Sequence, residues 1–419
     1  MLFMKEHVTK QARRAKEASR KLAWVSAEVR DAALLAMADA LEARQDEILE
    51  VNAKEVAAYK EKNIRLNMLD RLTLTPKRIA DMAEGIRQIV KLEDPISKFD
   101  FETLRPNGLK IRRVRVPFGV VGIIYEARPN VTADAIALCI KSANACILRG
   151  GSEAARTNKK IVDIMREAAI EKGIPENSIE FISILDRDAV VVMCRLRKLI
   201  DVIIPRGGKG LIERVIEHST VPVIETGTGV CHTFVDKTAD FDMAIKICIN
   251  AKVQRPSVCN AMETLLIHKD IAEKFLPKVA AALREKNVEL RGDEACLKIL
   301  PDMKAAIEDD WTTEYNALIL SIKIVDDVDA AIAHINKYGT EHSDTIITRD
   351  ADNAKKFQTL VDSACVYVNA STRFTDGFEF GFGAEIGIST QKLHARGPMG
   401  LDALTTMKYL VDGAGQIRG

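Results

Sequence analysis

Apolar residues recur every three or four positions through much of the first hundred residues, and this spacing predicts helices with one buried face. The first face comprises Val29, Ala33, Met37, Leu41 and Ile48, and the second comprises Ile79, Met82, Ile86 and Ile89. We expect the second helix to begin at Thr75-Pro76. Threonine can accept an unpaired backbone N–H there, and proline loses no hydrogen bond at the first helical position.

A different pattern follows Gly108, where aliphatic and basic residues interleave over residues 109–116. Such alternation predicts a strand with one solvated face. It slips at Arg112-Arg113, so a bulge is needed if all the apolar residues are to share a face. Residues 403–411 predict a closing strand, which together with 109–116 would suit pairing between subunits. We therefore expect a homo-oligomer.

From Gly119 onward, short apolar runs alternate with helical patterns. The expected strands are 120–125, 145–148, 179–184, 201–204 and 221–224, and the expected helices follow Thr132, span 153–172 and 189–198, and follow Gly210. Parallel neighbours need a crossover, so this order predicts a parallel sheet covered on both faces. A second set of apolar runs, including 261–268, 317–325 and 365–368, comes after residue 230. Two domains are expected, because 419 residues exceed one compact core.

Composition removes several classes of function. Lys and Arg total 61 against 60 for Asp and Glu, which leaves no basic excess for binding a polynucleotide. No apolar run approaches the roughly 18 residues that a membrane span needs, and residues 1–20 lack the apolar core of a secretion signal. The eight cysteines include no Cys-x-x-Cys pair and no zinc-ligand spacing. We expect a cytoplasmic protein with reduced thiols and no metal, nucleic-acid or membrane partner.

Two glycine-containing segments follow predicted strands. Pro205-Arg206-Gly207-Gly208-Lys209-Gly210 precedes a predicted helix, where backbone N–H groups can approach a pyrophosphate. The alternative is a solvated turn, since the segment matches no complete nucleotide motif. Arg149-Gly150-Gly151-Ser152 follows another strand. Arg149 can form a fork on a ribose 2′-phosphate, which favours NADPH, or it can be a surface arginine.

Cys259 is the strongest candidate nucleophile among the cysteines. It lies in Gln254-Arg255-Pro256-Ser257-Val258-Cys259-Asn260, where a neighbouring cation favours the reactive thiolate. Cys231, next to His232, is the rival, although neighbours on a strand point to opposite faces. Four further cysteines lie among apolar residues and are interpreted as core: Cys139, Cys146, Cys248 and Cys365.

Three long motifs resemble one known family. They are the stretches 116–132, 328–347 and 381–400, and they are similar to those of the gamma-glutamyl phosphate reductases, also called glutamate-5-semialdehyde dehydrogenases, of the aldehyde dehydrogenase superfamily. The resemblance implies an α/β fold with two doubly wound domains and a small β oligomerisation element. It implies an NADPH-binding domain at 1–230, with 100–116 in the oligomerisation ribbon. A catalytic domain would follow at 231–370, and 371–419 would return to the cofactor domain and end in the oligomerisation strand.

The resemblance also assigns roles to residues. Cys259 matches the nucleophile and Glu225 the superfamily's general base, while Asn130 lies near the oxyanion asparagine, whose aligned position is Ala127. Glu314 matches the residue that holds the nicotinamide ribose. The remaining cofactor candidates are Arg149, Gly150, Ser152, Arg206, Gly207, Gly208 and Gly210. Arg255, Arg128 and Arg396 are equal candidates for binding the substrate carboxylate and phosphate.

The implied activity is the NADPH-dependent reduction of L-glutamyl 5-phosphate to L-glutamate 5-semialdehyde through a cysteine thioester, in proline biosynthesis. A glutamate 5-kinase, which would make the labile substrate, is a candidate partner. The alternative within the superfamily is another semialdehyde or aldehyde dehydrogenase. A non-catalytic nucleotide-binding protein is the alternative outside it. A phosphotransferase is disfavoured, because no P-loop Lys-Ser/Thr pair follows the glycines.

Overall fold

The computed structural model describes residues 2–61, 69, 71–126 and 128–418, and it divides into two compact units. Unit 1 comprises Met1–Glu225, Gly381–Gly387 and Met399–Gly419, and unit 2 comprises Thr226–Phe380 and Ile388–Pro398. The expected division had one return of the chain at residue 371. In the structure the chain enters unit 2 once more, because β14 (Ile388–Ser389) pairs there with β15 (Gly397–Pro398) and Ser389 bridges to Thr226.

Unit 1 contains a four-stranded parallel sheet in the order β5-β4-β3-β6. Its strands are β3 (Val120–Tyr125), β4 (Ala145–Arg149), β5 (Ile179–Phe181) and β6 (Val202–Arg206). The predicted strand at 221–224 forms only a single bridge, between Ile203 and Val223. Pro222 has no N–H with which to extend that ladder, so this prediction was wrong.

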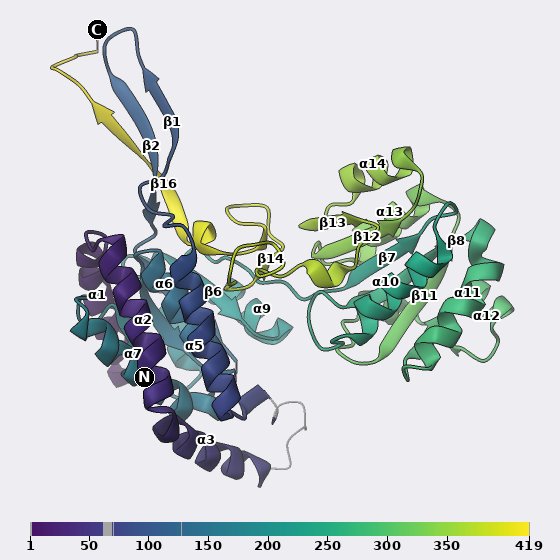
Figure 1. Cartoon of the computed structure of the whole chain (residues 1–419), viewed down its shortest axis with the longest axis horizontal. Helices are drawn as coiled ribbons and strands as arrows, with labels where there is room; N and C mark the ends of the chain where they lie inside the picture. Colours follow the sequence, from purple (N-terminus) through teal and green to yellow (C-terminus); the bar gives the residue numbers. More distant parts are fainter. Residues whose placement is uncertain (1, 62–68, 70, 127, 419) are drawn as a thin grey trace. The chain divides into compact units, whose positions relative to one another are not determined.

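Helices cover both faces of this sheet, as predicted (Figure 1). Apolar residues of α1 (Leu2–Leu22), α8 (Asp188–Cys194) and α9 (Lys209–His218) pack against one face. On the other face α6 (Pro129–Lys141) and α7 (Ala155–Glu171, after η1, Ser152–Ala154) contact the strands. Outside them lie α2 (Ala27–Ala43), α3 (Gln45–Lys60) and α5 (Pro76–Lys91).

Two details of these helices bear on the predictions. The Thr75 hydroxyl accepts the N–H of Arg78 at 3.2 Å and Pro76 is the first residue of α5, which confirms that start. The predicted face from Val29 to Ile48 is shared by two helices, because α2 ends at Ala43 and α3 begins at Gln45.

An antiparallel ribbon of three strands, in the order β1-β2-β16, also belongs to unit 1. Its members are β1 (Phe99–Leu104), β2 (Lys110–Pro117) and β16 (Thr405–Asp412), preceded by η4 (Leu401–Leu404). Figure 1 shows them side by side and extending away from the helices of unit 1. The pairing of β2 with β16 is regular, and the irregularity lies between Phe99 and Phe101 of β1. Both predicted strands are confirmed, and subunit pairing stays a prediction.

Unit 2 is built on a seven-stranded parallel sheet in the order β10-β9-β11-β8-β7-β12-β13. The strands are β7 (Cys231–Val235), β8 (Met262–His268), β9 (Glu289–Gly292), β10 (Lys304–Ala305), β11 (Ile319–Val325), β12 (Ser343–Ile347) and β13 (Cys365–Val368). The helices are α10 (Phe241–Val253), α11 (Lys269–Arg284), α12 (Glu294–Ile299), α13 (Val328–Tyr338) and α14 (Ala351–Leu360), with η2 (Glu308–Thr312) and η3 (Thr372–Phe374).

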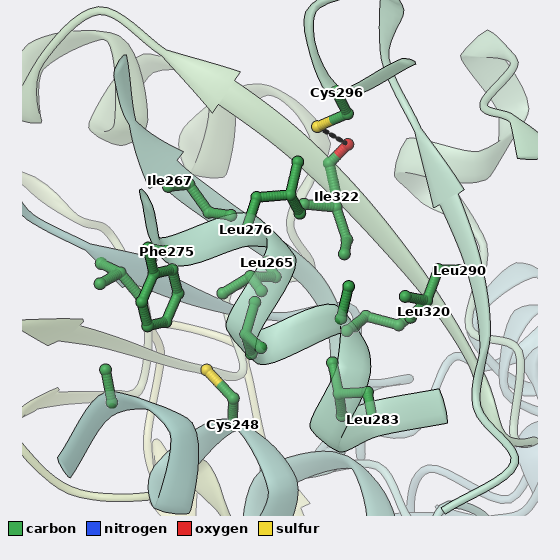
Figure 2. Packing of buried hydrophobic residues seen from close by; sticks show 14 of the residues in the cluster. Cys248, Leu265, Ile267, Phe275, Leu276, Leu283, Leu290, Cys296, Leu320 and Ile322 are labelled. Carbon is green, nitrogen blue, oxygen red and sulfur yellow. Dashed lines mark hydrogen bonds between the residues drawn. The ribbon is translucent and has the colours of Figure 1, made fainter. Parts of the chain in front are cut away.

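The central strand β8 contributes to a core on each face of this sheet. Leu265 and Ile267 join an apolar cluster with α10, α11 and α12, whereas Leu266 joins Phe234 and Phe357 on the other face. This division follows from the alternation of side chains along a strand. Figure 2 shows the first cluster, in which Cys248 and Cys296 lie among the aliphatic side chains.

Replacing Phe275, a fully buried member of that cluster, by alanine should lower the free energy of unfolding of unit 2 by about 3–5 kcal/mol. Urea unfolding measures the change. The control is Leu393→Ala, because Leu393 is 83% exposed and its loss should leave the transition in place. Equal effects of the two changes would show that the cluster does not dominate the stability of unit 2.

Candidate active site

Cys259 lies in the turn that joins α10 to β8, where the N–H of Ala261 donates to the carbonyl oxygen of Val258 at 3.0 Å. Cys259 is partly exposed, and the other seven of the eight cysteines, all within the described residues, are buried. The interpretation of Cys139, Cys146, Cys248 and Cys365 as core residues is therefore confirmed. A thiol must be accessible to act as a nucleophile, and exposure selects Cys259.

Cys231, the rival candidate, is fully buried at the start of β7. Burial and the nearby Asp344 carboxylate raise the pKa of its thiol well above the usual range. Its Sγ donates to the carbonyl oxygen of Cys259 at 3.2 Å. Cys231 therefore supports the Cys259 turn, and His232 is paired instead with Asp344, Nδ1 to Oδ1 at 2.9 Å.

Asn260 joins the Cys259 turn to the segment around η3. Its side-chain N–H donates to the carbonyl oxygen of Thr375 at 2.8 Å, and its own carbonyl oxygen accepts the Thr372 hydroxyl at 2.7 Å. The Asn260 side-chain oxygen accepts a hydrogen bond from Arg373. Thr375 is held in turn by hydroxyl contacts with Ser343 at 2.7 Å and Tyr367 at 2.8 Å.

Arg373 is a residue of this site that sequence reasoning missed. Its Nε donates to the side-chain oxygen of Gln254 at 3.0 Å, and its guanidinium also bonds Asn260. Burial and the charge of Arg255 lower its pKa, and a Cys259 thiolate acts in the opposite direction. Arg373 is 113 residues from Asn260 along the chain, so no local pattern could have placed it beside the Cys259 turn.

Gly229 and Glu314 lie against the same turn. A Cβ on Gly229 would lie 1.4 Å from the carbonyl oxygen of Cys259, so the turn can be held here only against a glycine. The N–H of Gly229 donates to the Glu314 carboxylate at 3.0 Å. The structure thus brings predicted residues Cys259, Arg255 and Glu314 into one region of unit 2.

A buried ion pair connects the two ends of the Cys259 loop. Lys252, on α10 before the loop, pairs with Glu263, on β8 after it. Burial lowers the pKa of Lys252 and raises that of Glu263, while each charge stabilises the other. Removing one partner of such a pair would leave an uncompensated buried charge.

The predicted cofactor residues other than Glu314 lie in unit 1, at the carboxyl ends of its strands. The chain passes from β3 to β4 and β5 on one side and then returns to β6 on the other, so the strand order reverses between β3 and β6. Ligands of open parallel sheets bind beside such a reversal. Arg206 ends β6, and Gly207 and Gly208 precede α9 at this point.

An anionic group already lies at the start of α9. The N–H of Gly208 donates to the Glu126 carboxylate at 3.0 Å, and a Cβ on Gly207 would lie 2.8 Å from the same side chain. A helix N-terminus favours negative charge, so the loop has the polarity that a pyrophosphate needs. Gly210 has open space around it.

Arg149 is 8% exposed, and among the described residues its guanidinium bonds two backbone carbonyl oxygens, those of Gly150 at 2.7 Å and Leu185 at 2.9 Å. Burial lowers its pKa, and its Nε has no hydrogen-bond partner among the described residues. Gly150 is packed against Tyr125 and Asn158, whose side chains a Cβ would meet. Ser152 is exposed at the start of η1.

Comparisons with known proteins show the family of this chain. The model of the aldehyde dehydrogenase family matches residues 2–297. Two proteins named gamma-glutamyl phosphate reductase are each 56% identical to the chain. The match to the protein of Caldanaerobacter subterraneus subsp. tengcongensis covers 97% of this chain and 98% of that protein. The match to the protein of Moorella thermoacetica covers 98% of each chain. The chain belongs to the aldehyde dehydrogenase family. Its predicted family and fold class are confirmed.

Solved structures extend the likeness to three dimensions. The gamma-glutamyl phosphate reductase of Thermotoga maritima is 49% identical, covers 98% of this chain and 100% of its own, and has a TM-score of 0.97. An acetylating aldehyde dehydrogenase of Geobacillus thermoglucosidasius, 17% identical, covers 100% of this chain and 99% of its own with a TM-score of 0.73, which shows a shared fold. Membership of the aldehyde dehydrogenase family implies a nicotinamide cofactor.

Several predicted residues belong to unit 1, whereas Cys259 belongs to unit 2. Glu225 is the last residue of the first segment of unit 1, and Arg128 and Asn130 lie at the start of α6 in the same unit. The Asn130 side chain bonds Asp134, whose pKa burial raises to about 6. Ala127 lies outside the described residues. These assignments of the aldehyde dehydrogenase pattern stay predictions.

Arg396, in the second segment of unit 2, is bonded to acids. Its guanidinium contacts the Asp362 carboxylate at 2.9 Å and that of Glu341 at 3.3 Å.

Within the described part of this aldehyde dehydrogenase chain, no helix is long and apolar enough to cross a membrane. The same residues contain no group of three or more His, Cys, Asp or Glu side chains placed to hold a metal.

Iodoacetamide should label Cys259 in the folded protein well before any other cysteine, because the other seven are buried. Mass spectrometry of digested samples measures the order of labelling. Cys259→Ser should abolish the fast phase, and Cys248→Ala, which removes a core thiol, should leave it unchanged. Equally fast labelling of a buried cysteine would contradict the assignment.

Proposed function

We propose that this chain reduces L-glutamyl 5-phosphate to L-glutamate 5-semialdehyde and phosphate with NADPH, as a step of proline biosynthesis. The observation that carries the proposal is the one accessible thiol, Cys259, held in a turn beside two arginines. The full-length similarity to proteins named gamma-glutamyl phosphate reductase supports the substrate.

In the first step the Cys259 thiolate attacks the acyl carbonyl carbon. The new C–S bond forms, the bond from carbon to the phosphate oxygen breaks, and phosphate leaves with the electron pair. A positive charge near the thiol favours the thiolate, and the attraction between Arg373 and a Cys259 thiolate supplies it. The product is a thioester on Cys259.

In the second step the thioester carbon accepts a hydride and becomes a thiohemiacetal. A reduced nicotinamide cofactor, when bound, supplies that hydride. The thiohemiacetal then collapses, the C–S bond breaks, and the semialdehyde leaves while Cys259 returns to the thiolate. No water attacks the thioester in this sequence, so the chemistry does not require Glu225 as a general base, and its role is proposed only from the family pattern.

The residues of unit 1 fit the proposed cofactor. Gly207 and Gly208 would approach the pyrophosphate at the start of α9, where the Glu126 carboxylate already binds an N–H. Arg149 would bind the 2′-phosphate, because within the described residues its Nε has no hydrogen-bond partner and its guanidinium bonds neutral carbonyl oxygens. An arginine fork matches a phosphate group, so we infer a preference for NADPH.

We also infer that the chain forms a homo-oligomer through the β1-β2-β16 ribbon. Phe99, Leu104 and Tyr409 of this ribbon are more than half exposed. Large apolar side chains gathered on one element commonly mark an interface. A glutamate 5-kinase remains a candidate partner, on the ground that the acyl phosphate substrate is labile.

Cys259→Ser should reduce the rate of NADP⁺ reduction with glutamate semialdehyde and phosphate by about 10⁴-fold or more, because an essential nucleophile is lost. Initial rates measure the loss, and Cys248→Ala should retain activity. Wild-type oxidation of simple aldehydes at the same rate without phosphate would instead indicate another aldehyde dehydrogenase. The absence of any turnover would favour a non-catalytic protein.

Arg149→Gln should raise the KM for NADPH by about 10- to 100-fold, the scale of a lost hydrogen bond to a charged group. The KM for NADH should change little, because NADH has no 2′-phosphate. Steady-state kinetics with each cofactor measure the difference. Parallel rises for both cofactors would assign Arg149 to the fold of the site rather than to recognition of the phosphate.

A further inference from the structure

We propose that Arg373 and Arg255 form an anion subsite that binds the phosphate group of the acyl phosphate beside Cys259. This inference rests on the proposed function and names the residues that recognise its leaving group. Sequence reasoning singled out three arginines without ranking them, and the structure adds a fourth.

The position of Arg373 is set by neutral partners. Gln254 Oε1 accepts its Nε at 3.0 Å, and Asn260, the residue after Cys259, accepts a second N–H. Amide oxygens orient a guanidinium without neutralising it. The Nη2 group forms no hydrogen bond within the described part of the chain, so donors remain for a ligand. A guanidinium carries five such donors.

Charge distinguishes these two arginines from others in unit 2. Arg291 pairs with Asp310 and Glu289, Arg349 with Asp240, and Arg396 with Asp362 and Glu341. Among the described residues neither Arg373 nor Arg255 forms a salt bridge with an acid. Asp376 attracts Arg373, and Arg255 repels it. Two neighbouring cations without an acid in contact are relieved by a bound dianion.

The chemistry of the first step uses a cation in this position. As the bond from the carbonyl carbon to the phosphate oxygen breaks, negative charge moves onto the phosphate oxygens. Arginine binds phosphate through two parallel N–H groups, and a charge placed in advance stabilises the departing group. In the reverse direction the same pair holds inorganic phosphate for attack on the thioester. Arg396 is less suited, since two carboxylates already contact it.

The test uses phosphate-dependent oxidation of glutamate semialdehyde by the full chain. Arg373→Gln should raise the KM for phosphate by about 10- to 100-fold, because a hydrogen bond to a charged group is lost. The KM for the semialdehyde should change by less than about threefold. Arg373→Lys, which keeps the charge and loses the fork, should fall between. Arg349→Gln is the control, because Arg349 is paired with Asp240 at the surface.

A second readout does not depend on turnover. Iodoacetate is an anion and iodoacetamide is neutral. The rate of alkylation of Cys259 by iodoacetate, divided by the rate with iodoacetamide, therefore reports the local positive charge. The ratio should fall in Arg373→Gln and in Arg255→Gln, and inorganic phosphate should protect Cys259 in the wild type. Arg255 is exposed, so its variant tests the subsite even if Arg373→Gln unfolds.

The outcomes separate the two proposals. The subsite would be overturned, and the proposed function would stand, if the wild type uses phosphate while both variants keep its KM for phosphate and its alkylation ratio. A wild type without phosphate-dependent activity would overturn the function. Phosphate protection of Cys259 that both variants lose would then still support the anion subsite.

Discussion

The close approach of two backbones governs this active site. The carbonyl oxygen of Cys259 occupies the space where a side chain of residue 229 would begin, and only glycine leaves that space free. The same contact places the N–H of Gly229 on Glu314 and the Cys231 thiol on the Cys259 oxygen. The Cys259 turn is therefore held against the segment that leads into β7, by the glycine at position 229 and the thiol of Cys231.

Around this turn, charges are arranged in two different ways. Below it, Lys252 and Glu263 are buried and neutralise each other across the ends of the loop. Beside it, Arg373 bonds neutral amides, and neither Arg373 nor Arg255 forms a salt bridge with a carboxylate among the described residues. The first arrangement stabilises the fold, because an unpaired charge at that depth would be costly. The second leaves positive charge for an anionic substrate. One pair therefore stabilises the fold, and the other is proposed to bind the substrate.

The local pattern of apolar residues was sufficient to predict much of the fold, and it failed at three places. The strands at 120–125 and 365–368 have the predicted bounds, because short continuous apolar runs mark strands that are buried or partly buried. The strand at 221–224 did not form, since Pro222 cannot extend the ladder beyond Ile203. The spacing of apolar residues does not reveal the break between α2 and α3 at Arg44. The return of 388–398 to unit 2 depends on pairing with Thr226, far away in sequence.

By itself the sequence determined the family and the parallel α/β architecture, because these depend on periodicity and long motifs, and the immediate neighbours of Cys259 made it the candidate nucleophile. The tertiary structure decided which other residues share its surroundings. Arg373 lies beside the Cys259 turn because Asn260 bonds the η3 segment, and Arg396 is paired with acids that no motif predicts. Partners of a side chain are set by contacts between distant segments, and a single sequence does not contain those distances.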